Sequence, residues 1–167
     1  ADLDEAIRVD PSWVEAWRNR AIVRSQAGDA PGALADCDEA VKRAPEDLEV
    51  RVTRGTLRAG AGDNDGAKSD LDAVLAKDPR NAVALIWRGN AKAALNDLRG
   101  ALADYEAACE AAPDSPEANA DRGMALLALG DREGARKSLE KALEVAPAGW
   151  AFRGEVEKSL AELRRGR

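Results

Sequence analysis

The chain has 167 residues, a formal net charge of -6 and a hydrophobic content of 45%, which is enough apolar material for a buried core. Its acidic balance argues against binding to nucleic acid or to acidic lipid surfaces, because phosphate recognition requires concentrated positive charge. The sequence contains no histidine and therefore lacks the usual general base near neutral pH and the commonest metal ligand. We expect neither catalysis nor a metal or other cofactor.

Apolar residues recur at helical spacing along the whole chain and predict an all-α protein. In chain order, the expected helices are residues 1–9, 13–27, 30–43, 47–61, 64–77, 81–95, 98–111, 115–129, 132–145 and 149–164. No apolar run reaches the about 18 residues of a membrane span, so we expect no membrane insertion and favour a cytoplasmic location. Because the chain begins with Ala1 inside a helical pattern, we interpret it as a fragment of a longer protein.

A period of 34 residues runs through the sequence. It is carried by prolines, by arginines that precede a small residue, and by aspartates that follow a glycine or asparagine. These columns are Pro11, Pro45, Pro79, Pro113 and Pro147; Arg20, Arg54, Arg88 and Arg122; and Asp29, Asp63, Asp97 and Asp131. The aspartates suit helix N-caps, the glycines before them suit left-handed turns, and each proline ends a helix. Each period is therefore predicted to form a helix hairpin.

The pattern resembles the tetratricopeptide repeat family, with Trp17, Ala21, Gly28, Ala33, Cys37, Ala40 and Pro45 at the family's positions in the first complete unit. The resemblance implies a right-handed superhelical solenoid of antiparallel helix hairpins, in which first helices line a concave groove. We expect a truncated repeat at residues 1–13, full repeats at 14–47, 48–81, 82–115 and 116–149, and a C-terminal capping helix at 150–167. On that last helix we expect an apolar face formed by Trp150, Phe152, Val156, Leu160 and Leu163.

By the same resemblance, the peptide-binding groove consists of Arg18, Asn19, Ile22, Val52, Thr53, Thr56, Val83, Ile86, Trp87, Asn90, Met124 and Leu127. The apolar members of the last two repeats form a predicted surface patch, with Trp87 as its anchor. Two alternatives stay open: Trp87 packs between neighbouring first helices, or the patch touches another copy or an adjacent segment. Acidic C-terminal tails of chaperones are disfavoured ligands, because Arg18 is the single cation at the places where family members that bind them carry a clamp of Lys and Asn.

Aspartates follow three of the repeated arginines at a fixed distance and suggest a ladder of structural ion pairs. The expected pairs are Arg20 with Asp36, Arg54 with Asp70, and Arg88 with Asp104; in the fourth repeat Ser138 interrupts the ladder. The alternative is a basic stripe for an acidic ligand, but the matched aspartates favour the structural interpretation. Cys37 and Cys109 stand in core columns and are interpreted as small apolar residues rather than as redox or metal groups.

The function indicated by the sequence is a protein-interaction module that receives a peptide or protein segment in its groove. One alternative is an assembly scaffold that self-associates or stacks on further repeats. Another is the regulatory or targeting region of a larger signalling or transferase protein.

Overall fold

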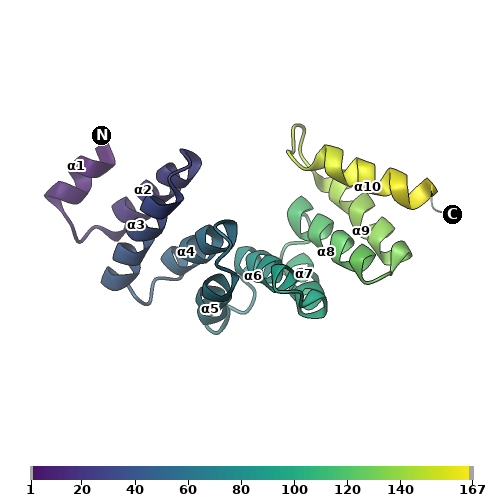
Figure 1. Cartoon of the computed structure of the whole chain (residues 1–167), viewed down its shortest axis with the longest axis horizontal. Helices are drawn as coiled ribbons and strands as arrows, with labels where there is room; N and C mark the ends of the chain where they lie inside the picture. The colour runs from purple at the N-terminus through teal and green to yellow at the C-terminus, as the bar shows by residue number, and fades with distance from the viewer. Residues whose placement is uncertain (1, 166–167) are drawn as a thin grey trace. The chain divides into compact units, whose positions relative to one another are not determined.

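The computed structural model describes residues 2–165, and over this range it contains ten α-helices and no strand (Figure 1). The helices are α1 (Asp2–Val9), α2 (Val14–Gln26), α3 (Ala30–Arg43), α4 (Leu48–Gly60), α5 (Asn64–Leu75), α6 (Ala82–Ala94), α7 (Leu98–Ala111), α8 (Pro116–Ala128), α9 (Arg132–Val145) and α10 (Arg153–Arg165). The chain divides into two compact units, Ala1–Pro79 and Arg80–Arg167. The predicted all-α repeat is confirmed.

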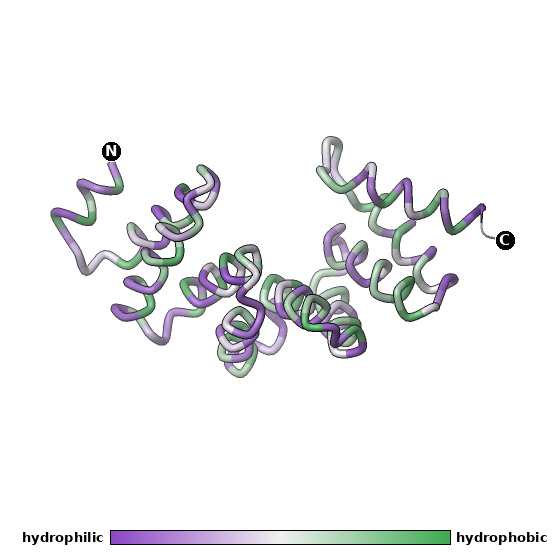
Figure 2. Tube along the Cα trace, in the orientation of Figure 1, coloured by the Kyte–Doolittle hydropathy of each residue, from purple (hydrophilic) through white to green (hydrophobic). Residues whose placement is uncertain are grey.

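Four helix hairpins repeat within the two units. In the first unit α2 packs on α3 and α4 on α5; in the second, α6 packs on α7 and α8 on α9. Hydrophobic and hydrophilic residues alternate along these helices (Figure 2), so each helix buries one stripe against its partner. Small residues dominate the buried stripe and allow the paired helices to approach closely.

Each hairpin turn has the same capping geometry. The carboxylates of Asp29, Asp63, Asp97 and Asp131 accept a hydrogen bond from the backbone N–H three residues later at 2.9–3.0 Å. Left-handed backbone precedes each cap, with φ of 84° at Gly28 and 66° at Asn96. The predicted caps and turns are confirmed.

Glycine at the position three residues after each cap has a role that the sequence reading did not identify. A Cβ atom at Gly32 would lie 2.1 Å from Asp29 Oδ2, and the equivalent glycines are similarly crowded. The glycine therefore leaves room for the capping carboxylate.

A second small position, directly after the repeated arginine, faces a large side chain of the partner helix. A Cβ atom at Gly55 would lie 2.8 Å from Leu71 Cγ, and one at Gly89 would lie 2.5 Å from Tyr105 Cε1. Where the first repeat has Ala21, the facing residue is the smaller Cys37, and both are fully buried. The sizes of the two facing residues are therefore complementary: glycine faces a large side chain, and alanine faces a smaller one.

The C-terminal helix begins later than predicted. Pro147 and Gly149, whose φ is 83°, form a turn in which Trp150 N–H donates to the Pro147 carbonyl, and α10 starts at Arg153. The expected helical face is therefore wrong for Trp150 and Phe152, which lie in the connection before α10. The other three expected residues, Val156, Leu160 and Leu163, are buried against a core that includes Leu139 and Ala142. Similarly, α5 ends at Leu75 rather than at residue 77.

Candidate functional site

In three hairpins, an arginine on the first helix forms a bidentate ion pair with a buried aspartate on the second helix. In each pair Nε and Nη2 donate to the two carboxylate oxygens at 2.5–2.9 Å. The pairs are Arg20–Asp36, Arg54–Asp70 and Arg88–Asp104, and the aspartates are 2–4% exposed. The hydrogen bonds that Arg20 donates to Asp36 raise the pKa of Arg20, although burial opposes the shift.

Each of these aspartates also contacts a second cation one helical turn further along the first helix. Nη1 of Arg24 lies 2.9 Å from Asp36, Nη1 of Arg58 lies 2.9 Å from Asp70, and Nζ of Lys92 lies 2.7 Å from Asp104. The sequence reading missed this column, although Arg24, Arg58 and Lys92 recur with the 34-residue period. Each buried carboxylate is thus shared by two cations, and Asp70 has a third, Arg51, at 3.8 Å.

In the fourth hairpin, both the buried aspartate and the second cation are replaced by uncharged residues. Arg122 Nε donates to the Ser138 hydroxyl at 3.0 Å, and the position of the second cation is occupied by Leu126, which packs on the core. Where the aspartate is absent, the second cation is absent too.

The predicted groove residues of the first unit are mostly polar, and three of them are held by contacts with residues of α4. Arg18 forms an ion pair with Glu49. The hydroxyls of Thr53 and Thr56 donate to backbone carbonyls of α4, each at 2.8 Å. Asn19 and Ile22 are exposed, and Val52 is half-buried.

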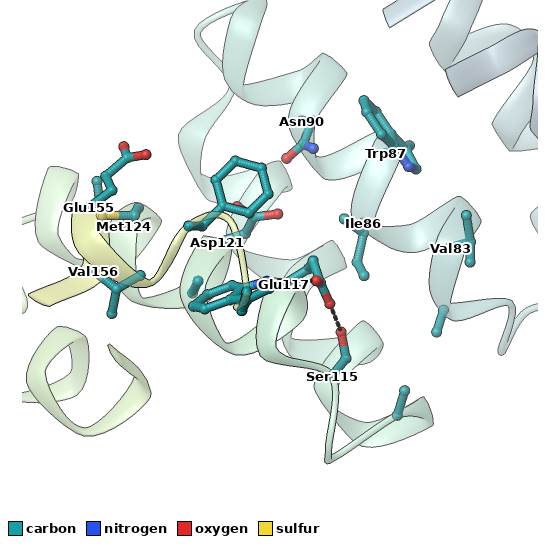
Figure 3. A pocket seen from close by; sticks show the side chains of 15 residues that line it. Val83, Ile86, Trp87, Asn90, Ser115, Glu117, Asp121, Met124, Glu155 and Val156 are labelled. Atoms are coloured by element: carbon teal, nitrogen blue, oxygen red, sulfur yellow. Dashed lines mark hydrogen bonds between the residues drawn. The ribbon is translucent and has the colours of Figure 1, made fainter. Parts of the chain in front are cut away.

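A pocket of about 650 Å³ lies in the second unit. Helix α6, helix α8, the turn before α8, and the start of α10 with its preceding connection line it. The lining residues are Ala82, Val83, Ile86, Trp87, Asn90, Ala112, Ser115, Glu117, Ala120, Asp121, Met124, Trp150, Phe152, Glu155 and Val156. Figure 3 shows the α6 side chains on one side, those of α10 on the other, and Asp121 between them.

Five of the predicted groove residues meet in this pocket: Val83, Ile86, Trp87, Asn90 and Met124. Leu127 is not among the lining residues, because it packs against the core beneath α8 and α9. The sequence reading missed Trp150 and Phe152, which it placed on the capping helix. Two aromatic residues directly after the last repeated proline were the available signal.

The two aromatic rings contributed by the connection are fixed in position. Trp150 and Phe152 pack edge to face with ring centres 5.9 Å apart. Trp150 Nε1 donates to Glu117 Oε1 at 2.8 Å, and Ser115 Oγ donates to the other oxygen of Glu117 at 3.2 Å (Figure 3). These contacts hold the aromatic wall of the pocket against α8.

Asp121 is a partly buried carboxyl group beside two other acidic side chains. Burial, together with the charges of Glu117 and Glu155, raises its pKa from 3.8 to about 6. All three charged side chains that line the pocket are acidic. Over the described part of the chain, the pocket therefore combines an apolar wall with negative charge that no lining cation balances.

Asn90 is oriented by a hydrogen bond beneath the pocket. Tyr105 Oη donates to Asn90 Oδ1 at 2.7 Å, and burial raises the pKa of the Tyr105 phenol, so it remains a donor. The Tyr105 ring occupies the space that Gly89 leaves open. This arrangement fixes the amide of Asn90 at the pocket surface.

Both cysteines are buried, and burial raises the pKa of Cys37 to about 12 and that of Cys109 in the same direction. Their thiols are therefore poor nucleophiles and metal ligands. Within residues 2–165 no group of three or more potential metal-binding side chains comes together. No helix of that range is long and apolar enough to cross a membrane.

Comparison with known proteins identifies relatives of the repeat. The sequence matches one family model described as tetratricopeptide repeat over residues 1–47 and 52–116, and a second with the same description over residues 116–148. No curated protein matches it at a significant level.

Several solved structures are similar in fold. PilW, described as a widely conserved type IV pilus biogenesis factor, is 20% identical, with a TM-score of 0.81 over 98% of this chain and 80% of its own. A thermophilic TPR protein of Thermus thermophilus is 22% identical, with a TM-score of 0.78 over 92% and 82%. YrrB, described as a TPR protein with an unusual peptide-binding site, is 19% identical, with a TM-score of 0.72 over 98% and 80%. At this identity the likeness establishes the fold alone.

Proposed function

We propose that this chain, which belongs to the tetratricopeptide repeat family, binds a segment of a partner protein in the pocket formed by α6, α8 and the connection before α10. The observation that carries the proposal is the group of large apolar side chains exposed around one hollow. Val83 is 49% exposed, Met124 38% and Phe152 54%. Such clustering on a water-facing surface marks binding sites, because isolated exposed apolar residues are common but contiguous ones are costly.

The size and construction of the pocket support this function. Its volume of about 650 Å³ accommodates a few side chains of a docked segment. Its walls are helices and the packed rings of Trp150 and Phe152, and Trp150 is hydrogen-bonded to Glu117. The loss of conformational entropy on ligand binding is therefore small. An apolar wall with Asn90 and three carboxylates at defined places supplies both affinity and orientation.

The character of the lining also disfavours one ligand class. Acidic C-terminal tails, such as those of chaperones, would place negative charge beside Glu117, Asp121 and Glu155. Repulsion between like charges in a partly buried site costs affinity. The proposed partner therefore presents an apolar or basic segment.

The test is capture of partners from native lysate by the wild-type chain and by a Trp87→Ala, Met124→Ala double variant. We expect the variant to lose a partner that the wild type retains, because both side chains line the pocket. A matched Ile22→Ala, Val52→Ala variant removes two apolar groove candidates of the first unit and should retain it. Circular dichroism and thermal unfolding establish that both variants are folded.

Retention of the partner by the pocket variant, with loss in the first-unit variant, would refute the pocket as the site. Sedimentation of the wild type over a range of concentrations decides whether the occupant is a second copy of the chain. In that case the mass rises with concentration and the pocket variant stays monomeric.

A further inference from the structure

We infer that the segment bound in this pocket inserts a lysine or arginine side chain, whose cationic group pairs with Asp121 while its methylene stem packs among the apolar lining residues. This inference rests on the proposed function and specifies the chemistry of its ligand. It follows from the charge, the burial and the aromatic walls of the pocket.

The charge of the pocket is one-sided. Glu117 and Asp121 lie one helical turn apart on α8, and Glu155 faces them from α10. No lysine or arginine is among the described residues that line the pocket. Elsewhere in the chain buried carboxylates are matched with cations, as Asp36, Asp70 and Asp104 are. The missing cation of this site is therefore one that a ligand can supply.

The groups packed around Asp121 do not neutralise it. Its described titratable neighbours are the two glutamates and, on α7, Tyr105 and Cys109. Burial and the charge of Asp121 raise the pKa of both α7 groups, which are protonated at neutral pH. The nearby cation Arg122 is turned to the other side of α8, where it donates to Ser138 at 3.0 Å and to Asn119 at 3.3 Å. Among residues 2–165, no cation is placed to neutralise an ionised Asp121.

The apolar walls suit the rest of a basic side chain. Lysine and arginine carry three or four methylene groups that pack on apolar surface while the charged end seeks a polar partner. Trp87, Trp150 and Phe152 line the same pocket, and aromatic rings attract cations that lie over their faces. An aliphatic side chain would fill this space equally well but would leave Asp121 desolvated and unpaired.

The test uses isothermal titration of the whole chain with four blocked pentapeptides, acetyl-Ala-Leu-X-Leu-Ala-amide, in which X is Lys, Arg, norleucine or Glu. Near pH 7.5 we expect the Lys and Arg peptides to bind at least about tenfold more tightly than the norleucine peptide, as a charge-assisted hydrogen bond implies. The Glu peptide should bind most weakly. Near pH 5, where Asp121 is largely protonated, the preference for a cation should shrink.

A matched pair of variants assigns the effect to its residue. Asp121→Asn removes the charge and keeps the shape, and it should abolish the preference for Lys over norleucine. Asp114→Asn is the same change at an exposed position of the same unit outside the pocket lining, and it should leave the preference intact. The indole N–H resonance of Trp150, which is hydrogen-bonded to Glu117, should shift when a peptide binds.

Each contrary result has a distinct meaning. Equal binding of the Lys and norleucine peptides would refute the cation and leave the proposed docking function standing. Binding that does not move the Trp150 resonance, or a preference that survives Asp121→Asn, would also overturn the inference. Failure of both cationic peptides to bind would overturn it as well, whereas the partner-capture experiment separately decides the proposed function.

Discussion

Ionised Asp121 lowers the free energy of unfolding of the protein. Its pKa is raised from 3.8 to about 6, first by burial and then by Glu117 and Glu155. The folded state therefore binds the proton more tightly than the unfolded state does. Stability from this group is fully present below the unfolded pKa and is lost as the pH rises through about 6. Near neutral pH the ionised form destabilises the fold by about 3 kcal/mol, at about 1.4 kcal/mol for each pKa unit.

We therefore expect Asp121→Asn to stabilise the chain by up to about 3 kcal/mol near pH 7.5. The gain should diminish as the pH falls toward 4.5, because wild-type Asp121 then becomes neutral as well. Urea unfolding of both proteins at a series of pH values measures the difference, and titrations common to both cancel. A variant with no gain at neutral pH, or with a gain independent of pH, would contradict the assignment.

At the scale of the helix hairpin, two pairings determine how closely the helices approach. The small residue after each arginine matches a large or small side chain opposite, as Gly55 matches Leu71. The arginine itself reaches across to a buried aspartate that a second cation also contacts. Arg20 and Arg54 additionally donate to Asp4 and Asp38 on the preceding second helix, at 2.7 and 2.9 Å.

Loss of a shared carboxylate should destabilise its hairpin strongly. Asp70 pairs with Arg54 and Arg58, whose side chains are only 14% and 24% exposed, and Arg51 lies 3.8 Å from it. Asp70→Ser therefore deprives three partly buried cations of this carboxylate. We expect a loss of about 2–4 kcal/mol. Adding Arg58→Leu reproduces the fourth hairpin, with its Ser and Leu at these places, and should recover part of that loss. Denaturant unfolding measures both values, and a double variant less stable than Asp70→Ser would refute the shared-carboxylate interpretation.

The hairpins could be predicted from the sequence because the residues that cap and end their helices recur every 34 residues. An aspartate after a glycine fixes a cap and a turn through local backbone geometry, and Asp29 and Gly28 behave as that geometry requires. The second cation column was missed because its convergence on the aspartate depends on side-chain reach across two helices. A spacing along one helix does not reveal that reach.

The pocket could be predicted only on the side formed by first helices. Val83 and Met124 were placed by their positions in the repeat, and both line the pocket. The opposite wall depends on where α10 starts, and Pro147 with Gly149 delays that start to Arg153. Helical periodicity extended backwards through this turn misplaced Trp150 and Phe152. The 34-residue period therefore predicts the positions of the hairpin residues, but it does not predict the connection after Pro147.

At the scale of the whole molecule, the first and the last of the described helices contribute unequally to the buried core. Helix α10 buries Val156, Leu160 and Leu163 against the core of the last hairpin, whereas α1 has Ile7 as its one buried residue among those described. Repeat proteins need a terminal element that covers the apolar edge of the last unit.

Truncation after Gly149 should therefore be far more damaging than removal of residues 1–12. The first change exposes Leu139 and Ala142, which are fully buried in the intact chain, and we expect a large fall in melting temperature together with loss of solubility. The second removes buried Ile7 and the Asp4 partner of Arg20, and it should cost about 1.5–3 kcal/mol, the value of one buried aliphatic side chain. Thermal scans with light scattering compare the two; equal losses would show that α10 does not act as a cap.

The matched pairs within a hairpin also limit how such a gene can recombine. Ala21 faces Cys37 and Gly55 faces Leu71 at the same separation along the chain. A crossover inside a hairpin that joined the Ala21 helix to the Leu71 helix would press a methyl group into a space that admits only hydrogen. A crossover in the turn that carries the repeated proline would transfer both partners together. The heritable unit of this array is therefore the intact hairpin, and duplications that add length without loss of stability should have their breakpoints between hairpins.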